Sequence, residues 1–377
     1  MTSATPPTPP ARGKIVPKLV LSLVATAALV WIMKSGSLPI VPPSKEFARV
    51  AGWTLPAYFG VWAVAYFVRL ARWYLLLAPV EEVPLRTVLR VNAVGLFAIA
   101  LLPFRMGEVL RPLMIRKNPR LTFWAASGTI AGERILDGLS VSVLLLLGLR
   151  IASPRPDLPD HIGAFPIHVE IVPRAAFVSA LFFTSVCVVM AIFYFWRAWA
   201  RQMTEVVIGL VSLKFARWLA GKIEQMAEGL GFLAYRRYSV PYVSATVLYW
   251  FLNAACFWVL ACGCGLGHIG YFGAVATMGV VALGILFPAT PGFFGPFQLA
   301  TYAALAMYLD ADAVTGVGSV YAFLAYTLPI GLTTVVGIIG ILLKPSALLN
   351  LASEPRAEAN AAPKTWPAER EQATAER

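Results

Sequence analysis

The sequence predicts an all-α fold, a polytopic integral membrane helical bundle with about eight crossings plus a re-entrant helical pair. Hydrophobic residues make up 59% of the 377-residue chain and charged residues only 13%, whereas about a quarter of the residues of a soluble globular protein are charged. The mean hydropathy is +0.72. Apolar stretches of the roughly 20 residues that a helix needs to cross a bilayer recur along the chain. We expect their cores near residues 19–33, 54–80, 87–103, 121–149, 175–195, 241–265, 271–290, 297–309 and 313–343.

The two ends of the chain differ from this apolar centre. Residues 1–14 and 345–377 are rich in Pro, Ala and Glu and have little to bury, so we expect disordered tails on either side of one transmembrane domain over residues 15–344. The first apolar run follows three basic residues, as in a signal peptide, but no small-residue cleavage site comes after Met33. It is therefore predicted to be an uncleaved signal-anchor.

Basic residues predict the orientation of the chain. Seven Lys or Arg residues lie between 197 and 237, while the short loops between the later apolar runs carry none, which places residues 197–237 and the C-terminus in the cytoplasm. Five crossings from a basic, cytoplasmic N-terminus would end on the wrong side. A re-entrant pair over residues 87–117, which turns near Pro103 in the segment LLPFRMGEVLRP (residues 101–112) and leaves on the face it entered, restores the parity. The alternative is an extracytoplasmic N-terminus with nine crossings.

Two groups of charged residues occur where lipid is expected. They are Arg105, Glu108 and Arg111, and then Glu133, Arg134 and Asp137. Six isolated charges at mid-membrane would cost roughly 15–20 kcal/mol, which exceeds the net stability of a typical fold. The side chains must therefore pair with one another or be hydrated. The G-x-x-x-G step formed by Gly128 and Gly132, just before the second group, would let a neighbouring backbone approach closely.

Two interpretations of these six residues stay open. One is a structural network of ion pairs at a helix end near the membrane interface. The other is a polar cavity that binds the charged headgroup of a lipid, with Arg105 and Arg111 on the phosphate and the acidic residues orienting the arginines. Both can hold together. A re-entrant turn favours a pocket, because non-helical backbone at membrane depth is tolerated only inside protein or beside a wet cavity.

Further residues are candidates for lining such a pocket. Arg69 and Arg72 are spaced i, i+3 beside Trp73, a pattern that arginines snorkelling to an aromatic belt also explain. Asn92 opens the predicted re-entrant segment. The stretch FPATPGFFGPFQLA, residues 287–300, cannot be a continuous helix. It predicts either a broken helix at a binding site or a tight hairpin at the membrane surface, and its candidate lining residues are Pro291, Gly292, Gly295 and Gln298.

Three of these stretches together resemble the lysylphosphatidylglycerol synthase transmembrane, or flippase-like, domain family. They are P-F-R-M-G-E-V-L-R-P at 103–112, G-E-R-I-L-D at 132–137 and P-A-T-P-G-F-F-G-P-F-Q at 288–298, and R-L-A-R-W at 69–73 also fits. The resemblance implies a multi-pass protein of the bacterial inner (plasma) membrane that translocates, or helps to modify, anionic or isoprenoid-type lipids. By the same resemblance, Arg105, Gly107, Glu108 and Arg111 match the first motif, and Glu133, Arg134 and Asp137 match the second.

The third motif departs from the family pattern. Phe293 stands where relatives commonly have a second glycine, and Gln298 stands for a glutamate. An arginine of the last helix is replaced near Ala322 or Ala325. If that glutamate and arginine pair in relatives, both have been neutralised here, which keeps the fold but alters substrate or coupling chemistry. We also expect a stand-alone member, without the soluble aminoacyl-transferase domain of bifunctional relatives.

Three classes of function follow from these patterns. The first is a lipid flippase or scramblase whose partners are membrane lipids, bound through anionic headgroups. The second is a lipid-modifying transferase with Glu108, Glu133 or Asp137 as general base, and the third is an accessory subunit of envelope-lipid synthesis. No cofactor is expected, and no metal site, because the His and Cys residues lack ligand spacing. The absence of a Walker A motif argues against direct ATP-driven pumping. Basic residues at the membrane surface explain the net charge of +12, so no nucleic-acid partner is expected.

Overall fold

The computed structural model describes residues 24, 26–31, 33–35, 38–116, 121–158, 161–162, 165–166, 170–196, 202–203, 206, 213–286 and 290–343. The predicted tails lie outside the described residues. The described part of the chain is a bundle of helices with one two-stranded hairpin, in which β1 (His161–Ile162) pairs antiparallel with β2 (Phe165–Pro166). The predicted all-helical membrane fold is confirmed at this level. The count of eight crossings stays a prediction.

Five helical segments are long and apolar enough to cross a membrane. They are α3 (Thr54–Leu77), α7 (Ile171–Phe195), α10 (Arg236–Gly263), the segment Gly267–Gly284 that contains η4 (Gly267–Ile269) and α11 (Gly270–Gly284), and α14 (Val317–Leu342). With 29 residues, α6 (Phe123–Ile151) is longer than any of these, but it contains the charges of the second group. The chain is therefore a multi-pass membrane protein.

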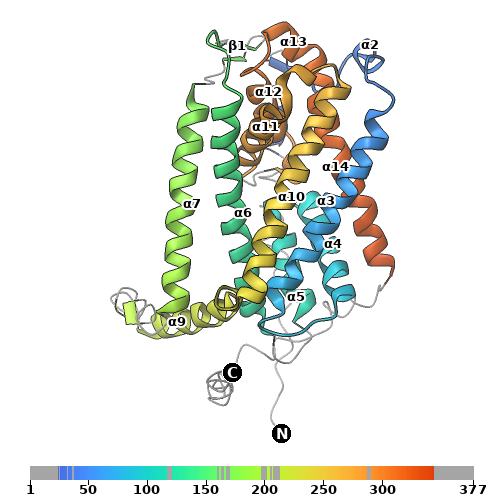
Figure 1. Cartoon of the computed structure of the whole chain (residues 1–377). Helices are drawn as coiled ribbons and strands as arrows, with labels where there is room; N and C mark the ends of the chain where they lie inside the picture. The colour runs from blue at the N-terminus through green and yellow to red at the C-terminus, as the bar shows by residue number, and fades with distance from the viewer. Residues whose placement is uncertain are drawn as a thin grey trace.

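Short helices form two hairpins inside the bundle (Figure 1). The first consists of α4 (Leu85–Leu101), the turn η2 (Pro103–Arg105) and α5 (Gly107–Ile115), and the second of α11, η5 (Pro291–Phe293) and α12 (Pro296–Leu305). At 1.5 Å per residue, α5 is about 14 Å long and α12 about 15 Å, half the thickness of the hydrocarbon core. Figure 1 shows the first hairpin in the lower half of the bundle and the second in the upper half. Re-entry of either hairpin from the membrane surface stays a prediction.

Local sequence explains where these elements begin. The side chain of Thr122 caps α6 by accepting a hydrogen bond from the backbone N–H of Ala125 at 3.1 Å. Pro84 precedes α4, and Pro296 occupies the first turn of α12, positions where the missing N–H of proline costs no helical hydrogen bond. The polar ends of the bundle hold α2 (Ser44–Phe47), β1 and α13 (Ala311–Thr315) at one side and α9 (Leu213–Glu228) at the other (Figure 1).

Small residues bring helices into close contact. A Cβ on Gly107 would lie 2.2 Å from the carbonyl oxygen of Gly95, so glycines permit the close approach of α4 and α5. A Cβ on Gly128 would lie 2.0 Å from the carbonyl oxygen of Met226, so the G-x-x-x-G step admits the end of α9. These contacts hold α5 closely against α4 and α6 closely against the end of α9.

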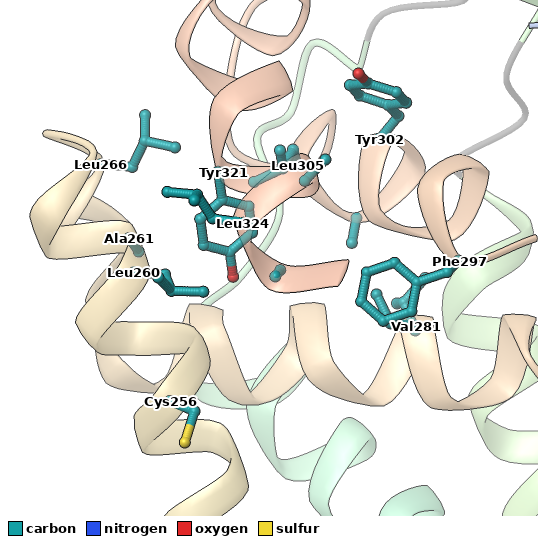
Figure 2. Packing of buried hydrophobic residues seen from close by; sticks show 14 of the residues in the cluster. Cys256, Leu260, Ala261, Leu266, Val281, Phe297, Tyr302, Leu305, Tyr321 and Leu324 are labelled. Carbon is teal, nitrogen blue, oxygen red and sulfur yellow. The ribbon is translucent and has the colours of Figure 1, made fainter. Parts of the chain in front are cut away.

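The apolar core joins the second hairpin to α10 and α14. Figure 2 shows Leu260 and Ala261 of α10 facing Tyr321 of α14, and Phe297 of α12 lying against Val281 of α11. These side chains are all at most 9% exposed. The upper half of the bundle is therefore held by dispersion and shape complementarity.

Candidate functional site

The two charged groups predicted from the sequence meet in the interior of the bundle. Arg111 of α5 donates a hydrogen bond from Nη2 to Oε2 of Glu133 of α6 at 2.8 Å. Arg134 contacts the carboxylate of Glu133 and lies 3.9 Å, Nε to Oε1, from Glu108. The side chain of Arg111 is fully buried and that of Glu133 is 2% exposed. The predicted convergence of the two groups is therefore seen in the structure.

Arg72 of α3 lies at the centre of this network. Its Nη1 and Nη2 donate to the two carboxylate oxygens of Asp137 at 2.6 and 2.7 Å, and Nη2 also reaches Oε1 of Glu133 at 3.3 Å. The fork geometry matches the bidentate arrangement that makes arginine–carboxylate pairs strong. Arg72 is 1% exposed. The interpretation of Arg72 as a snorkelling arginine is therefore wrong, since a snorkelling side chain keeps its charge in water.

Aromatic residues cover the buried guanidinium groups. The Cζ atom of Arg111 lies 4.3 Å from the ring centroid of Trp73, and that of Arg72 lies 4.8 Å from the ring centroid of Tyr249. The indole N–H of Trp250 donates to Oδ1 of Asp137 at 3.1 Å. Ring faces and one N–H thus stabilise charges that water cannot reach, and they hold α3, α5, α6 and α10 together.

A cavity of about 330 Å³ opens beside the network, where the turns of the two hairpins meet. Its polar wall contains Arg69, Arg105, Arg134, Asp137 and Asn253. The opposite wall is apolar and aromatic, and it includes residues of α11, the η5 turn and α14. The volume falls at the lower end of the range of small-molecule sites, about 300–1,000 Å³. The cavity therefore has one charged wall and one apolar wall. Such a pair of walls suits an amphiphilic ligand, which has a charged headgroup and an apolar tail.

Arg69 and Arg105 are the arginines least neutralised around this cavity. No Asp or Glu side chain of the described residues lies within 4.0 Å of Arg69, and its Nε is buried without a hydrogen-bond partner. Among the carboxylates of the described residues, Arg105 approaches one, that of Glu108, at 3.8 Å from Nε to Oε1. Counting both, five arginines face three carboxylates here. The site therefore carries a net charge of +2, whereas the two predicted groups alone would be neutral.

Arg105 has an unusual backbone. Its φ is +53° and that of Phe104 is +55°, in the left-handed region that few residues other than glycine adopt. Such conformations cost of order 1–3 kcal/mol and cluster at functional sites. The 22% exposed side chain of Arg105 is thereby directed to the cavity.

The remaining predicted lining residues have different positions. Gly292 lines the cavity. Asn92 is buried and donates from Nδ2 to the carbonyl oxygens of Arg69 and Leu70 at 3.3 and 3.1 Å, which ties α4 to α3. Gln298 is buried and accepts from the N–H of Gly295 at 2.7 Å, so it caps α12. Pro291 begins the η5 turn. Lipid binding by any of these residues stays a prediction.

The stretch around Pro291 lies in the interior. The Cζ atom of Arg105 is 5.3 Å from the ring centroid of Phe293, so the η5 turn reaches the cavity. The η5 turn therefore lies beside the cavity and next to the first hairpin, and the choice between a broken helix at a binding site and a tight hairpin at the membrane surface stays a prediction. Sequence reasoning missed Tyr249, Trp250 and Asn253 of α10, although a lone asparagine in the apolar run YWFLNAACFW was a usable indication.

Comparison with known families agrees with this architecture. The family model described as "Lysylphosphatidylglycerol synthase TM region" matches residues 19–341. The chain belongs to this family. The comparisons with curated proteins and with solved structures found no match. Membership of the lysylphosphatidylglycerol synthase TM family links this membrane protein to lipid biology, and the family match spans the charged network, the cavity and both hairpins.

Proposed function

We propose that this protein translocates lipids across the bacterial inner membrane, by admitting an anionic headgroup to the cavity beside the charged network. Isoprenoid-linked lipids with a phosphate belong to the same class of cargo. The single observation that carries the proposal is the pair of arginines, Arg69 and Arg105, that face the cavity without full neutralisation. In the proposed orientation, residues 197–237 and the C-terminus lie in the cytoplasm.

The chemistry of the cavity walls supports this proposal. A phosphate between Arg69 and Arg105 would neutralise the excess charge, and it would accept hydrogen bonds from groups such as the two unpartnered Nε atoms. The apolar wall formed by Phe293, Phe297 and Tyr326 suits the first carbons of the lipid tails. The buried pairs of Arg72 and Arg111 would then be the rigid support that holds the cavity open.

The pairing of the carboxylates favours transport over lipid modification. A general base needs a carboxylate free to take a proton. Glu133 contacts three arginines, and Asp137 accepts from both Arg72 and Trp250. Glu108 is the least engaged, with both of its ion-pair distances close to 4 Å. A transferase therefore ranks second, with Glu108 as its base.

Redistribution of labelled lipids in reconstituted vesicles tests the proposal. We expect the wild-type protein to move labelled phosphatidylglycerol faster than labelled phosphatidylcholine. Arg69→Gln and Arg105→Gln each remove charge-assisted hydrogen bonds of about 1.5–3 kcal/mol, so the apparent affinity for the anionic lipid should fall about 10- to 100-fold. Arg49→Gln is the matched control, because Arg49 pairs only with Glu46 and its side chain is 71% exposed.

Two results would count against lipid transport. The first is a wild-type protein that redistributes none of a panel of anionic lipids. The second is unchanged transport in both cavity variants, with wild-type unfolding midpoints showing that they are folded. Chemical turnover of lipid in detergent, lost in Glu108→Gln, would instead support the transferase.

A further inference from the structure

The bundle contains two halves with the same order of elements. In the first half, α3, α4, η2, α5 and α6 follow one another, and in the second half the order is α10, α11, η5, α12 and α14, with the short η4 and α13 inserted. The long helices have 24 and 29 residues in the first half and 28 and 26 in the second. The short helices have 17 and 9 residues, and 15 and 10. Each half is thus a long helix, a hairpin of short helices and a second long helix.

The halves are related by inversion. The end of α10 meets the start of α3, where the N–H of Ala51 donates to the carbonyl oxygen of Gly263 at 2.9 Å, so these two helices are antiparallel. The hairpins are exchanged between the halves, because α4 packs against α14 and α11 packs against α6. Figure 1 shows the two hairpins in opposite halves of the bundle. An inverted repeat of this kind places a pathway at the interface between the repeats.

The turns of the two hairpins share an unusual feature, two successive residues in the left-handed region. Each begins with proline, continues with two residues of positive φ and reaches glycine four residues after the proline. The φ values are +55° and +53° at Phe104 and Arg105, and +60° and +59° at Gly292 and Phe293. Arg105 and Phe293 therefore occupy equivalent positions in P-F-R-M-G and P-G-F-F-G.

These two equivalent residues touch each other. The guanidinium of Arg105 lies over the ring of Phe293 at 5.3 Å, and both side chains line the cavity. A contact between equivalent residues of two inverted halves lies on the axis that relates the halves. The pair therefore sits where the two hairpin turns close on each other, at the middle of the bundle.

Resting on the proposed function, we propose that Arg105 and Phe293 form the central gate of the lipid pathway. In the closed gate, the Phe293 ring is the partner of Arg105. The arriving phosphate takes the place of the ring, and the η5 turn separates from the η2 turn so that the headgroup passes between them. Phe293 and Gly292 are thus positioning and gating residues of the second hairpin.

Charge distribution identifies the η5 turn as the part that moves. The first hairpin is anchored by Arg111 to Glu133, a buried pair whose separation would leave uncompensated charges in the membrane interior. Residues 269–309 contain no Asp, Glu, Lys, Arg or His, so the second hairpin has no side-chain ion pair to break. Its contact with the first hairpin at this point consists of a cation–π interaction and van der Waals packing.

A reversible cross-link between the turns tests this gate. In a background without the four native cysteines, Ala100→Cys and Gly292→Cys would place one thiol on α4 and one on the η5 turn, whose backbones are in contact because a Cβ on Gly292 lies 3.1 Å from the carbonyl oxygen of Ala100. Oxidation by a short, reducible bis-thiosulfonate linker joins the two thiols without requiring the geometry of a direct disulfide. Oxidation should slow the redistribution of labelled phosphatidylglycerol about tenfold relative to the reduced protein, as expected when the gating motion is blocked. Reduction should restore the rate.

A second cross-link serves as the matched control. Gly284→Cys with Ala300→Cys joins α11 to α12 inside the second hairpin, where a Cβ on Gly284 would lie 2.5 Å from the Cβ of Ala300. Oxidation of this pair should leave the rate unchanged, because the hairpin moves as a unit. Equal rates before and after oxidation of the Ala100–Gly292 pair would overturn the gate while the proposed function stands.

Substitution of Phe293 gives an independent measurement. Phe293→Tyr keeps a ring over Arg105 and should preserve the preference for phosphatidylglycerol over phosphatidylcholine. Phe293→Leu keeps apolar bulk without a ring, so the gate should close less tightly and the preference should fall about threefold or more. Identical preferences in both variants would contradict the gate, and a wild type that moves no lipid would overturn the proposed function and the gate together.

Discussion

The two inverted halves share one helical plan and are held together by different forces. The first half, residues 54–151, contains all five arginines and all three carboxylates of the buried network. Between residues 238 and 309 the second half has no Asp, Glu, Lys or Arg at all. Its helices pack mainly through glycines and apolar side chains, and α10 reaches the network through the N–H of Trp250 and the ring of Tyr249. One topology thus supports a rigid, charged half and an uncharged half that can move.

The difference follows from the cost of charge in a low-dielectric interior. Paired charges resist separation strongly, because removing one partner leaves the other buried and uncompensated. Apolar contacts in a membrane resist separation weakly, since lipid tails replace them at little cost. In the proposed transport cycle, the first half would supply the fixed binding wall and the second hairpin the movable one.

The largest effect should come from breaking the charged half at its centre. Arg72→Met leaves Asp137 without its bidentate partner and Glu133 with one partner fewer. Loss of one member of a buried ion pair typically costs about 3–5 kcal/mol. We therefore expect a strongly lowered thermal unfolding midpoint in detergent, and a much smaller loss in the double variant Arg72→Met/Asp137→Leu.

The surface pair of Arg49 and Glu46 provides the reference for this experiment. Arg49→Met removes an ion pair of 2.9 Å whose arginine is 71% exposed, and exposed pairs contribute about 0–1 kcal/mol. Its midpoint should stay close to wild type. If Arg72→Met were as mild as Arg49→Met, the charged half would not be rigid and the comparison of the halves would fail.

A smaller effect is expected at the turn of the uncharged half. Gly292→Ala puts a Cβ on a residue with φ of +60°, 3.1 Å from both the carbonyl oxygen of Ala100 and the hydroxyl oxygen of Tyr326. Left-handed backbone costs a non-glycine residue about 1–2 kcal/mol, and the close contacts add to this. Thermal unfolding should show a moderate loss of stability.

Gly331 offers a contrasting position in the same half. It lies inside α14, and a Cβ there would meet nothing within 4 Å. Gly331→Ala should be neutral or stabilise the protein by up to about 1 kcal/mol, because alanine is the better helix former. Equal midpoints for Gly292→Ala and Gly331→Ala would show that the η5 turn is not a tightly specified element.

The smallest difference is expected between the helix caps of the two halves. Gln298 caps α12 in the second half, and Thr122 caps α6 in the first, each through one hydrogen bond to a backbone N–H. Gln298→Ala and Thr122→Ala should each cost about 1 kcal/mol. A loss several times larger in Gln298→Ala would assign Gln298 a role beyond capping, and transport by that variant would then need to be measured.

Much of the site was predictable from the sequence, because an unpaired charge inside an apolar run has a high free-energy cost in the membrane. Arg111 and Glu133 have opposite charges, so pairing them with each other lowers the free-energy cost of burying both. The position of Arg72 was harder to predict, because an arginine near an aromatic residue is equally typical of an anchor at the membrane interface. Only its depth in the bundle, against Asp137, shows which is correct.

The inverted repeat could not be recognised in the sequence, because the two equivalent turns differ in side-chain chemistry. P-F-R-M-G and P-G-F-F-G share two residues in five, and one is polar where the other is aromatic. Their equivalence becomes visible in the backbone, through matching positive φ values at Phe104 and Gly292 and at Arg105 and Phe293.

Composition and the placement of charges determined by themselves that this chain is a helical membrane protein with a buried charged network, because hydrocarbon tolerates neither open backbone nor isolated charge. Tertiary structure decided that Arg72 stands at the centre of the network, that Arg69 and Arg105 face a cavity, and that two hairpin turns meet there. All three features depend on which helices pack against one another. Pairings between segments far apart in the sequence, such as α4 with α14, depend on the shape of whole helix surfaces, and no local pattern of residues encodes them.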